Sequence, residues 1–200
     1  LGRHVAVILW PSHLSERVWM RLTGSKVFLR FLEQEDAEPL RALRERNAGF
    51  FQRYSPTHDS SYCSLERARS LIEDSRRDRE EGRDYYFGIF LNESEELIGT
   101  VNLFHVLRGP LQKCMIGYSL DRRHNGHGYA TEAVSMAVRF SFDELKLHRV
   151  EAGVMPENVA SMRVLEKVGF QKEGIERKGV KINGRWEDHQ IFSVLSDRED

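Results

Sequence analysis

Two glycines between a strand-like and a helix-like segment constrain the fold of this chain more than any other feature. The run CMIGYSLD is rich in strand-forming residues, and Gly126 and Gly128 follow it within a few positions. From residue 129 to about 143, small and apolar side chains recur at helical spacing, which predicts a helix packed closely on a sheet. A helix N-terminus offers unpaired N–H groups and the positive end of a dipole, and preceding glycines let an anion approach. The arrangement favours an anion-binding turn, although any tight strand-to-helix connection also uses glycine.

Two other interpretations of this turn are weaker. His124 and His127 are suitable metal ligands, but a zinc site needs three or four converging ligands, and neighbouring loop residues rarely face one ion. A dinucleotide-binding turn would have a third glycine, whereas Tyr-Ala-Thr follows Gly128. We therefore expect no metal ion and treat the two histidines as hydrogen-bond donors at most.

Local signals along the rest of the chain predict a mixed α/β fold. Asn158 has the position of a helix N-cap, Gly169 that of a helix C-terminus, and Asn183 with Gly184 gives a strong hairpin signal. An aromatic loop is expected over residues 47–56. We expect helices at residues 35–46, 64–82, 129–143 and 158–170, and strands at residues 26–33, 85–94, 96–107, 114–121, 148–155, 174–182 and 189–195. This order predicts one sheet with a layer of helices on each face.

Composition restricts the classes of partner. The 30 Lys and Arg residues balance 31 Asp and Glu, so no global charge would draw the chain to nucleic acid or an anionic membrane. Cys63 and Cys114 lack a metal-type spacing, which predicts reduced thiols in a cytoplasmic protein. The apolar run VAVILW stops at Pro11, which argues against a signal peptide and a membrane span. With 200 residues we expect one domain over residues 18–200, preceded by an extension of unclear role at residues 1–17.

Arg123, three positions before Gly126, completes the pattern Arg/Gln-x-x-Gly-x-Gly/Ala. With this pattern the sequence resembles the GNAT superfamily of acetyl-CoA-dependent N-acetyltransferases, and in particular the RimJ/RimL-type ribosomal-protein alanine N-acetyltransferases. The resemblance runs from about Val18 to Leu195 through segments in the family order, namely YYFGIF, IGTVNLFHVLRG, IGYSLDRRHNGHGYATEA, HRVEAGVMPENVASMRVLEKVGFQKEG and INGRWEDH. It implies the GNAT fold, a mixed, mostly antiparallel seven-stranded sheet with helices on both faces.

The same resemblance implies acetyl-CoA as co-substrate, held in a cleft where the fourth and fifth predicted strands splay apart. The pyrophosphate would lie on the N–H groups of residues 123–128, and Arg122 and Arg123 would suit its charge unless they are merely solvated. Asn158 would contact the pantetheine arm while capping its helix. The implied cofactor-binding residues are the backbone at Tyr118, Ser119 and Leu120, and at the turn Arg123, His124, Asn125, Gly126, His127, Gly128, Tyr129, Ala130 and Thr131.

Acetyl transfer requires a neutral amine, a carbonyl held close to it and donors for the charge that develops. The resemblance implies that Ser161 protonates the departing thiolate, although a serine near a helix start is commonplace. An α-amino group with a pKa near 8 is roughly one quarter neutral at pH 7.4, against about one in a thousand for a lysine side chain. An enzyme that acts on protein N-termini can therefore work with a weak base.

The base itself is the point at which this sequence departs from the family pattern. Some relatives carry a glutamate at the positions that correspond to Gly153 or Val180. Glu151 lies two residues before Gly153 and so shares its strand face, which makes it our candidate base. The alternative is a strand-edge residue that pairs with Arg149 or a lysine. Weaker candidates at the start of the last strand are Asp188 and His189.

The acceptor site gives fewer signals. Asn102 occupies a matched position on the third predicted strand, where it would hold the incoming amine or a peptide carbonyl. Phe51, with Phe50 and Tyr54, would wall a pocket for a small first residue, unless this cluster is local core. We expect acetylation of the N-terminal α-amino group of a ribosomal protein. The alternatives are a small-molecule amine, such as a polyamine, amino sugar or drug, and a non-catalytic CoA-binding ribosome-associated factor; a homodimer is compatible with the sequence.

Overall fold

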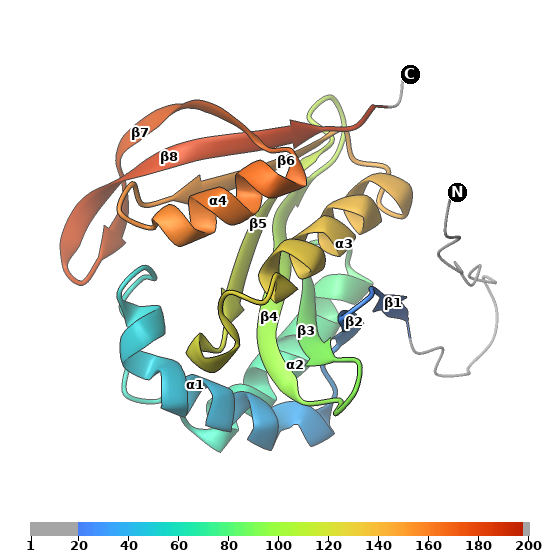
Figure 1. Ribbon diagram of the computed structural model, residues 1–200, viewed down its shortest axis with the longest axis vertical. Coiled ribbons are helices and arrows are strands. Elements are labelled where there is room, and N and C mark those ends of the chain that lie inside the picture. The colour runs from blue at the N-terminus through green and yellow to red at the C-terminus, as the bar shows by residue number, and fades with distance from the viewer. Residues whose placement is uncertain (1–19, 198–200) are drawn as a thin grey trace.

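Eight strands form one sheet in the computed structural model, which describes residues 20–197 (Figure 1). The strands are β1 (Arg21–Thr23), β2 (Val27–Phe31), β3 (Tyr85–Leu91), β4 (Leu97–Leu107), β5 (Lys113–Leu120), β6 (Arg149–Val154), β7 (Gln171–Ile182) and β8 (Arg185–Leu195). Their order in the sheet is β1-β2-β3-β4-β5-β6-β8-β7, and only β5 and β6 are parallel. The predicted mixed, mostly antiparallel sheet is therefore confirmed, whereas the predicted extension at residues 1–17 lies outside the described residues.

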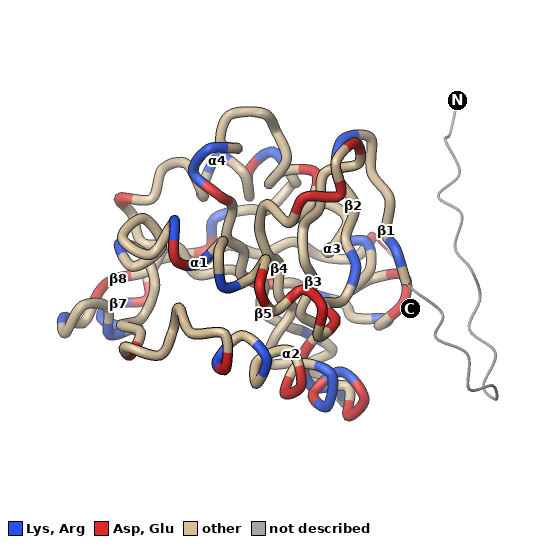
Figure 2. Tube along the Cα trace, turned by 90° about the horizontal axis from the view of Figure 1, so that it is seen from below, with Lys and Arg blue, Asp and Glu red and all other residues tan. Residues whose placement is uncertain are grey.

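Two helices lie on each face of the sheet, as predicted. Helices α1 (Ala37–Gln52) and α2 (Leu65–Glu80) pack on one face, and α3 (Tyr129–Asp143) and α4 (Val159–Val168) pack on the other (Figure 1). One-turn 3₁₀ helices, η1 (Gln34–Asp36) and η2 (Arg122–His124), precede α1 and α3. Acidic and basic residues lie close together along α2, whose outer face is in solvent (Figure 2). No helix among residues 20–197 has the length and hydropathy needed to cross a membrane.

The larger hydrophobic core lies between the sheet and the helices α3 and α4. Ala133 and Ala137 of α3 are fully buried in it, together with Val101 and Leu103 of β4. Because alanine side chains are small, α3 packs closely across the middle of the sheet, where it contacts β2, β4, β5 and β6. This close packing brings the N-terminus of α3 to the ends of the central strands.

The predicted strand count and several predicted boundaries were wrong, since β7 and β8 also begin before the predicted residues 174 and 189. The sheet has eight strands and not seven, because a turn at Gly24 returns the three-residue strand β1 along β2. Helix α1 continues to Gln52, although residues 47–56 were predicted to be a loop. The reason is a contact with a distant segment: the amide of Asn47 donates to the carbonyl of Leu43 at 2.9 Å and accepts from the Arg122 N–H at 3.0 Å. A contact of this kind leaves no local pattern in the sequence.

Other local predictions are confirmed. Helix α3 spans the predicted residues, and Asn158 caps α4 through a hydrogen bond from the Ser161 N–H at 3.2 Å. Gly169 ends α4 with a φ of 102°, in the left-handed region. Asn183 and Gly184 form the β7–β8 turn with φ values of 50° and 81°.

The two parallel strands separate part-way along their length. Pairing between β5 and β6 covers three residues on each strand and ends at Met115 and Glu151. Strand β5 then continues to Leu120 with β4 as its neighbour, and β6 continues to Val154 with β8 as its neighbour (Figure 1). The fourth and fifth predicted strands, residues 114–121 and 148–155, correspond to β5 and β6. The predicted splay between them is therefore present, and we call the point where they separate, after Met115 and Glu151, the fork.

Candidate functional site

The glycine turn lies between η2 and α3. Gly126 and Gly128 have φ values of 84° and 83°, a conformation that costs other residues roughly 1–2 kcal/mol. No atom lies within 4 Å of a β-carbon added at Gly126, and the nearest to one at Gly128 is Lys26 Nζ at 3.8 Å. Gly128 is the N-cap of α3, and Tyr129, Ala130 and Thr131 form its first turn. The turn thus exposes its backbone directly before the positive end of α3.

The N–H groups at the turn fall into two sets. Those of Arg123, His124 and Asn125 already donate within the loop, to Asp121 Oδ1, the Asp121 carbonyl and the Arg122 carbonyl at 3.1, 2.8 and 3.3 Å. The N–H groups of residues 126–131 donate to no other atom of the described chain. Of the predicted range of 123–128, residues 126–128 therefore have free N–H groups, and residues 129–131 extend this free set.

The two histidines of the turn lie against an aromatic ring. The His127 ring stacks on Tyr129 with a centroid separation of 5.4 Å, and the His124 ring meets the edge of Tyr129 at 6.2 Å. His124 Nδ1 is buried and has no hydrogen-bond partner in the described chain. Among residues 20–197, no group of three or more His, Cys, Asp or Glu side chains is placed to hold a metal ion. These rings shape the surface beside the free N–H groups.

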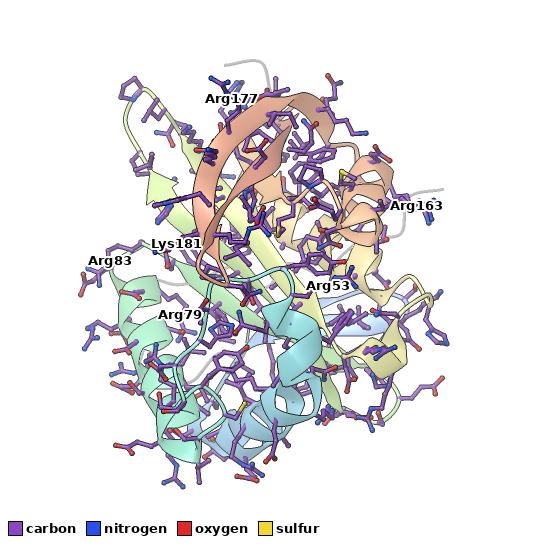
Figure 3. The ribbon with its side chains drawn as sticks, turned by 90° about the vertical axis from the view of Figure 1, so that its left-hand side faces the viewer. Arg53, Arg79, Arg83, Arg163, Arg177 and Lys181 are labelled. Atoms are coloured by element: carbon purple, nitrogen blue, oxygen red, sulfur yellow. The ribbon has the colours of Figure 1, made fainter. Side chains whose placement is uncertain are left out.

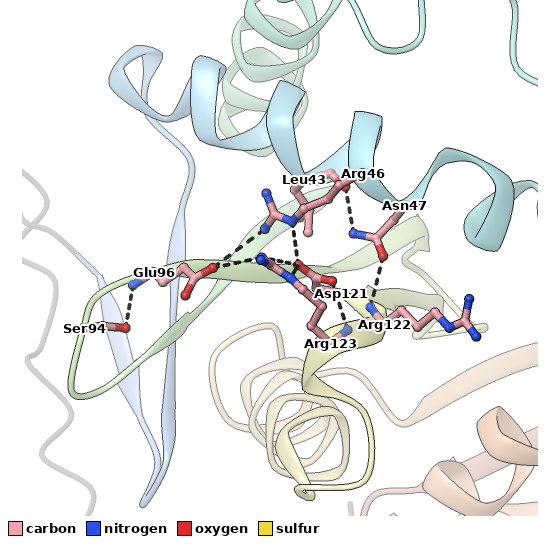
Figure 4. Close-up of polar contacts among 8 residues, drawn as sticks. All are labelled: Leu43, Arg46, Asn47, Ser94, Glu96, Asp121, Arg122 and Arg123. Atoms are coloured by element: carbon pink, nitrogen blue, oxygen red, sulfur yellow. Dashed lines mark hydrogen bonds and ion pairs between the residues drawn. The ribbon is translucent and has the colours of Figure 1, made fainter.

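Residues of α1 hold the start of the turn, which the sequence did not indicate (Figure 4). Arg46 Nε donates to Asp121 Oδ2 at 2.6 Å, and Asn47 accepts the Arg122 N–H. Arg123 turns its guanidinium to Asp121 at 3.0 Å and to Glu96 at 3.3 Å. Burial alone would raise the pKa of Asp121, but hydrogen bonds from Arg123 and Arg46 hold it well below its ordinary range. The expected phosphate cation Arg123 is thus engaged by two carboxylates.

A second group of polar atoms lies where β5 faces the N-terminus of α4. The Tyr118 hydroxyl lies 2.7 Å from Ser161 Oγ and donates to the Ser161 carbonyl at 3.0 Å. Burial raises the pKa of Tyr118 to about 12, so this hydroxyl keeps its proton at neutral pH. Asn158, which caps the same helix, holds the Ser161 N–H. The structure therefore brings the predicted residues Ser161 and Asn158 together with the side chain of Tyr118. The sequence had indicated a role only for the backbone of Tyr118.

The backbone of β5 beyond the fork has a free side. Residues 116–120, which include the predicted Tyr118, Ser119 and Leu120, pair with β4 and have no strand partner on the side of β6. The Ser119 hydroxyl is 3.0 Å from Thr100 Oγ1, a contact with β4. An extended chain placed in the gap would therefore meet unpaired backbone groups of β5.

Glu151 lies at the fork, but its carboxylate is not free. It contacts Lys113 Nζ at 3.1 Å and Arg149 Nε at 2.7 Å. Burial would raise the pKa of Glu151, and hydrogen bonds from Arg149 and Lys113 outweigh this and lower it. The structure thus shows the alternative role, a strand residue paired with an arginine and a lysine. A carboxylate held by two cations is a poor proton acceptor.

The weaker candidates for a base lie on β8. Asp188 accepts the Lys178 N–H at 2.8 Å and is exposed. His189 is buried, and its Nδ1 lies 3.3 Å from the carbonyl of Glu187. A β-carbon added at Gly153 would lie 3.7 Å from the His189 ring, so this imidazole borders the strand beyond the fork.

The predicted acceptor residues lie on the face of the sheet that α1 covers. Asn102 sits between Tyr86 of β3 and Gly117 of β5, and its Oδ1 is buried without a hydrogen-bond partner. Phe51 is in the last turn of α1, and its ring centroid lies 6.0 Å from that of Phe50. No hydrogen bond or ring contact among residues 20–197 joins Phe51 to Asn102.

The end of α1 meets the β7–β8 turn. Gln52 Nε2 donates to Asn183 Oδ1 at 3.1 Å, and Asn183 Nδ2 donates to the carbonyl of Gln52 at 3.2 Å. Arg53 follows this contact on α1, and Lys181 precedes it on β7; both are exposed (Figure 3). The C-terminal end of α1 is thus tied to the β7–β8 turn.

Comparison with known proteins gives consistent matches. Residues 26–171 match the family model described as Acetyltransferase (GNAT) domain. The probable N-acetyltransferase YjcK of Bacillus subtilis (strain 168) is 50% identical over 175 residues, which cover 88% of this chain and 97% of that protein. The ribosomal protein uS5-alanine N-acetyltransferase of Escherichia coli (strain K12) is 31% identical over 177 residues, which cover 88% of this chain and 91% of that protein.

Solved structures show the same likeness. The ribosomal-protein-S5-alanine acetyltransferase from Vibrio fischeri superposes with a TM-score of 0.84 at 28% identity and covers 89% of this chain and 97% of its own. Mycobacterium smegmatis RimJ, solved in complex with CoA-disulfide, superposes with a TM-score of 0.82 at 29% identity and covers 86% of this chain and 82% of its own.

Proposed function

This chain belongs to the GNAT acetyltransferase family and is an N-acetyltransferase, and on that premise we propose that its acceptor is the α-amino group at the N-terminus of a ribosomal protein. The observation that carries this proposal is the 31% identity to the ribosomal protein uS5-alanine N-acetyltransferase over nearly the whole of both chains. GNAT acetyltransferases use acetyl-CoA, and structural neighbours were solved with CoA or acetyl-CoA bound.

The state of Glu151 supports an α-amino acceptor. Its ion pairs with Lys113 and Arg149 lower its pKa, so it accepts a proton poorly at neutral pH. An amine with an ordinary pKa near 8 is already neutral in roughly a quarter of molecules at pH 7.4, whereas a lysine side chain must first lose a proton to a base. A site whose fork carboxylate is ion-paired therefore suits a protein N-terminus better than a lysine.

The cofactor is proposed to lie across the fork. The pyrophosphate would accept hydrogen bonds from the free N–H groups of residues 126–131, where the α3 dipole adds to the attraction. The pantetheine would pair with the free side of β5 at residues 118–120, close to Asn158. The proposed cofactor would thus contact the free N–H groups of the glycine turn, the free side of β5 and the cap of α4.

The side chains at the fork supply the remaining parts of the reaction. Ser161 Oγ, hydrogen-bonded to the Tyr118 hydroxyl, is our proposed proton donor to the departing thiolate, and the proton that the acetylated amine loses would restore Ser161. Asn102 Oδ1 is our proposed acceptor for an N–H of the incoming amine. A buried carbonyl without a partner costs about 1–3 kcal/mol, and a substrate N–H would remove this cost.

A free-thiol release assay tests the acceptor class. Acetyl-CoA is supplied with peptides that start with Ala, Ser or Met, and in separate reactions with spermidine or an aminoglycoside. We expect thiol release with the Ala or Ser peptides and none with the same peptides carrying a blocked N-terminus. Two outcomes would overturn the ribosomal-protein proposal. One is thiol release only with spermidine or the aminoglycoside, and the other is the absence of release with every acceptor in the panel.

A further inference from the structure

A buried carboxylate connects the glycine turn to two distant parts of the chain. Asp121 is 1% exposed and accepts hydrogen bonds from Arg46 of α1 and from Arg123. Glu96, at the β3–β4 turn, lies 3.3 Å from Arg123 Nη2 and 3.9 Å from Arg46 Nη2. Two carboxylates and two guanidinium groups from three segments thus form one cluster, which we call the Asp121 clasp (Figure 4).

The clasp holds the backbone directly before the free N–H groups. Asp121 Oδ1 accepts the Arg123 N–H at 3.1 Å, and beside it Asn47 of α1 accepts the Arg122 N–H at 3.0 Å. These bonds set the conformation of η2, from which the chain enters the left-handed turn at Gly126. The orientation of the N–H groups at residues 126–131 therefore depends on a segment that is tied to α1.

We propose that the Asp121 clasp positions the glycine turn for the cofactor pyrophosphate, and that Arg123 acts in it as a positioning residue and not as a phosphate ligand. The inference rests on the cofactor placement in the proposed function. A backbone already held in its binding conformation loses less conformational entropy when the ligand binds. Loss of the clasp should therefore weaken cofactor binding without altering the reacting groups at the fork.

The contacts of Arg123 argue against a simpler role as a free cation. If its guanidinium turned to a phosphate, the buried carboxylate of Asp121 would lose one of its two arginine partners, which disfavours that movement. Arg122, the preceding residue, has an exposed guanidinium with no ion pair in the described chain. Arg122 therefore supplies the mobile positive charge at the turn, and Arg123 supplies the support.

A double-mutant cycle tests this division of roles through the dissociation constant of CoA, measured by isothermal titration calorimetry without any acceptor. We expect Asp121→Asn and Arg123→Gln each to raise Kd about tenfold, and the double variant also to raise it about tenfold, because both changes break one cluster. Multiplied losses, about hundredfold in the double variant, would show that Arg123 binds the phosphate independently and would overturn the proposal.

Arg46 and Arg41 provide a matched pair on α1. Arg46→Gln removes the α1 side of the clasp and is expected to raise Kd as Asp121→Asn does. Arg41→Gln removes the same charge from the same helix, but Arg41 pairs with Glu38 and Glu45, so its loss should leave Kd unchanged. If Asp121→Asn does not fold, Arg46→Gln takes its place in the double-mutant cycle. Kd is then compared for Arg46→Gln, Arg123→Gln and the double variant. An unchanged Kd in all the clasp variants would overturn the proposal.

Two further readouts separate positioning from a general loss of stability. The KM for acetyl-CoA should rise in the clasp variants while kcat at saturating cofactor is retained. Hydrogen exchange should become faster at the amides of residues 122–125, whose acceptors belong to Asn47, Asp121 and Arg122. Because CoA binding requires no acceptor, a failure of peptide acetylation would contradict the proposed function and leave this test intact.

Discussion

Single polar atoms carry much of the chemistry expected at the fork. The Tyr118 hydroxyl is part-buried, keeps its proton at neutral pH and lies within hydrogen-bond distance of Ser161 Oγ. Ser161 alone, at the start of α4, would be an ordinary helix residue. In the proposed reaction, the Tyr118 hydroxyl would hold Ser161 Oγ in the orientation needed to donate a proton.

Asn102 is the residue at which acceptor binding can be tested separately from cofactor binding. Asn102→Ala removes a buried Oδ1 that has no partner within the chain. We expect KM for a reactive peptide to rise about tenfold, which corresponds to one lost hydrogen bond, with KM for acetyl-CoA unchanged. Steady-state kinetics with each substrate varied in turn provide the measurement.

Asn92 offers the matched control for this change. Its Oδ1 is also buried without a partner, and its Nδ2 donates to the carbonyl of Gly24, far from the fork. Asn92→Ala is expected to lower the melting temperature slightly and to change neither KM. If Asn102→Ala raised both KM values equally, its effect would be structural and the acceptor role would be wrong.

Among the secondary-structure elements, the junction of the glycine turn with α3 is the proposed site of the cofactor pyrophosphate. Gly126→Val adds a branched side chain where no atom lies within 4 Å of the new β-carbon, so it causes no clash in the fold. The left-handed φ costs roughly 1–2 kcal/mol, and the side chain covers the adjacent N–H groups. We expect CoA binding to be abolished in calorimetry while the circular dichroism spectrum is retained.

Gly109 is the control position for that element. It also has a positive φ, 65°, and open space around an added β-carbon, but it lies in the β4–β5 turn. Gly109→Val should impose a similar backbone strain and leave CoA affinity unchanged. Equal affinity in Gly126→Val and the unmodified protein would contradict the placement of the pyrophosphate at the turn.

Elements differed in how well their sequences predicted them. Helix α4 was predicted with both ends, because Asn158 and Gly169 act within one turn of the helix that they terminate. Helix α1 was predicted too short, because its last turns are stabilised through Asn47 by a segment 75 residues away in the chain. A terminus set by a residue inside the element can be read from the sequence, whereas one set by a distant partner cannot.

For the whole molecule, ion pairs around β6 link stability to pH. Hydrogen bonds from Arg149 and Ser193 lower the pKa of Glu173 from 4.5 to about 2. A carboxylate whose pKa is lower in the folded state stabilises the fold above its ordinary pKa, and this stabilisation is lost as the pH falls through the folded value. We expect the melting temperature to be nearly constant above pH 5 and to fall between about pH 4.5 and 2.

Thermal melts of two variants across that range check this assignment. Glu173→Gln removes the ionisable partner and should flatten part of the acid transition. Glu157→Gln removes an exposed carboxylate that has no ion pair in the described chain, and should leave the transition unchanged. An acid transition of the same size in Glu173→Gln and the unmodified protein would contradict the role of this ion pair.

The predicted cytoplasmic location stays a prediction.

The sequence by itself determined the order of the elements, the glycine turn before α3, the cap of α4 and the β7–β8 turn. Each of these depends on residues within a few positions of one another, so their spacing carries the information. Only the tertiary structure decided that Glu151 is ion-paired, that Tyr118 reaches Ser161, and that the guanidinium of Arg123 pairs with Asp121. Those contacts depend on which strands and helices become neighbours, and a side chain's partner is set when the sheet and its helices pack together.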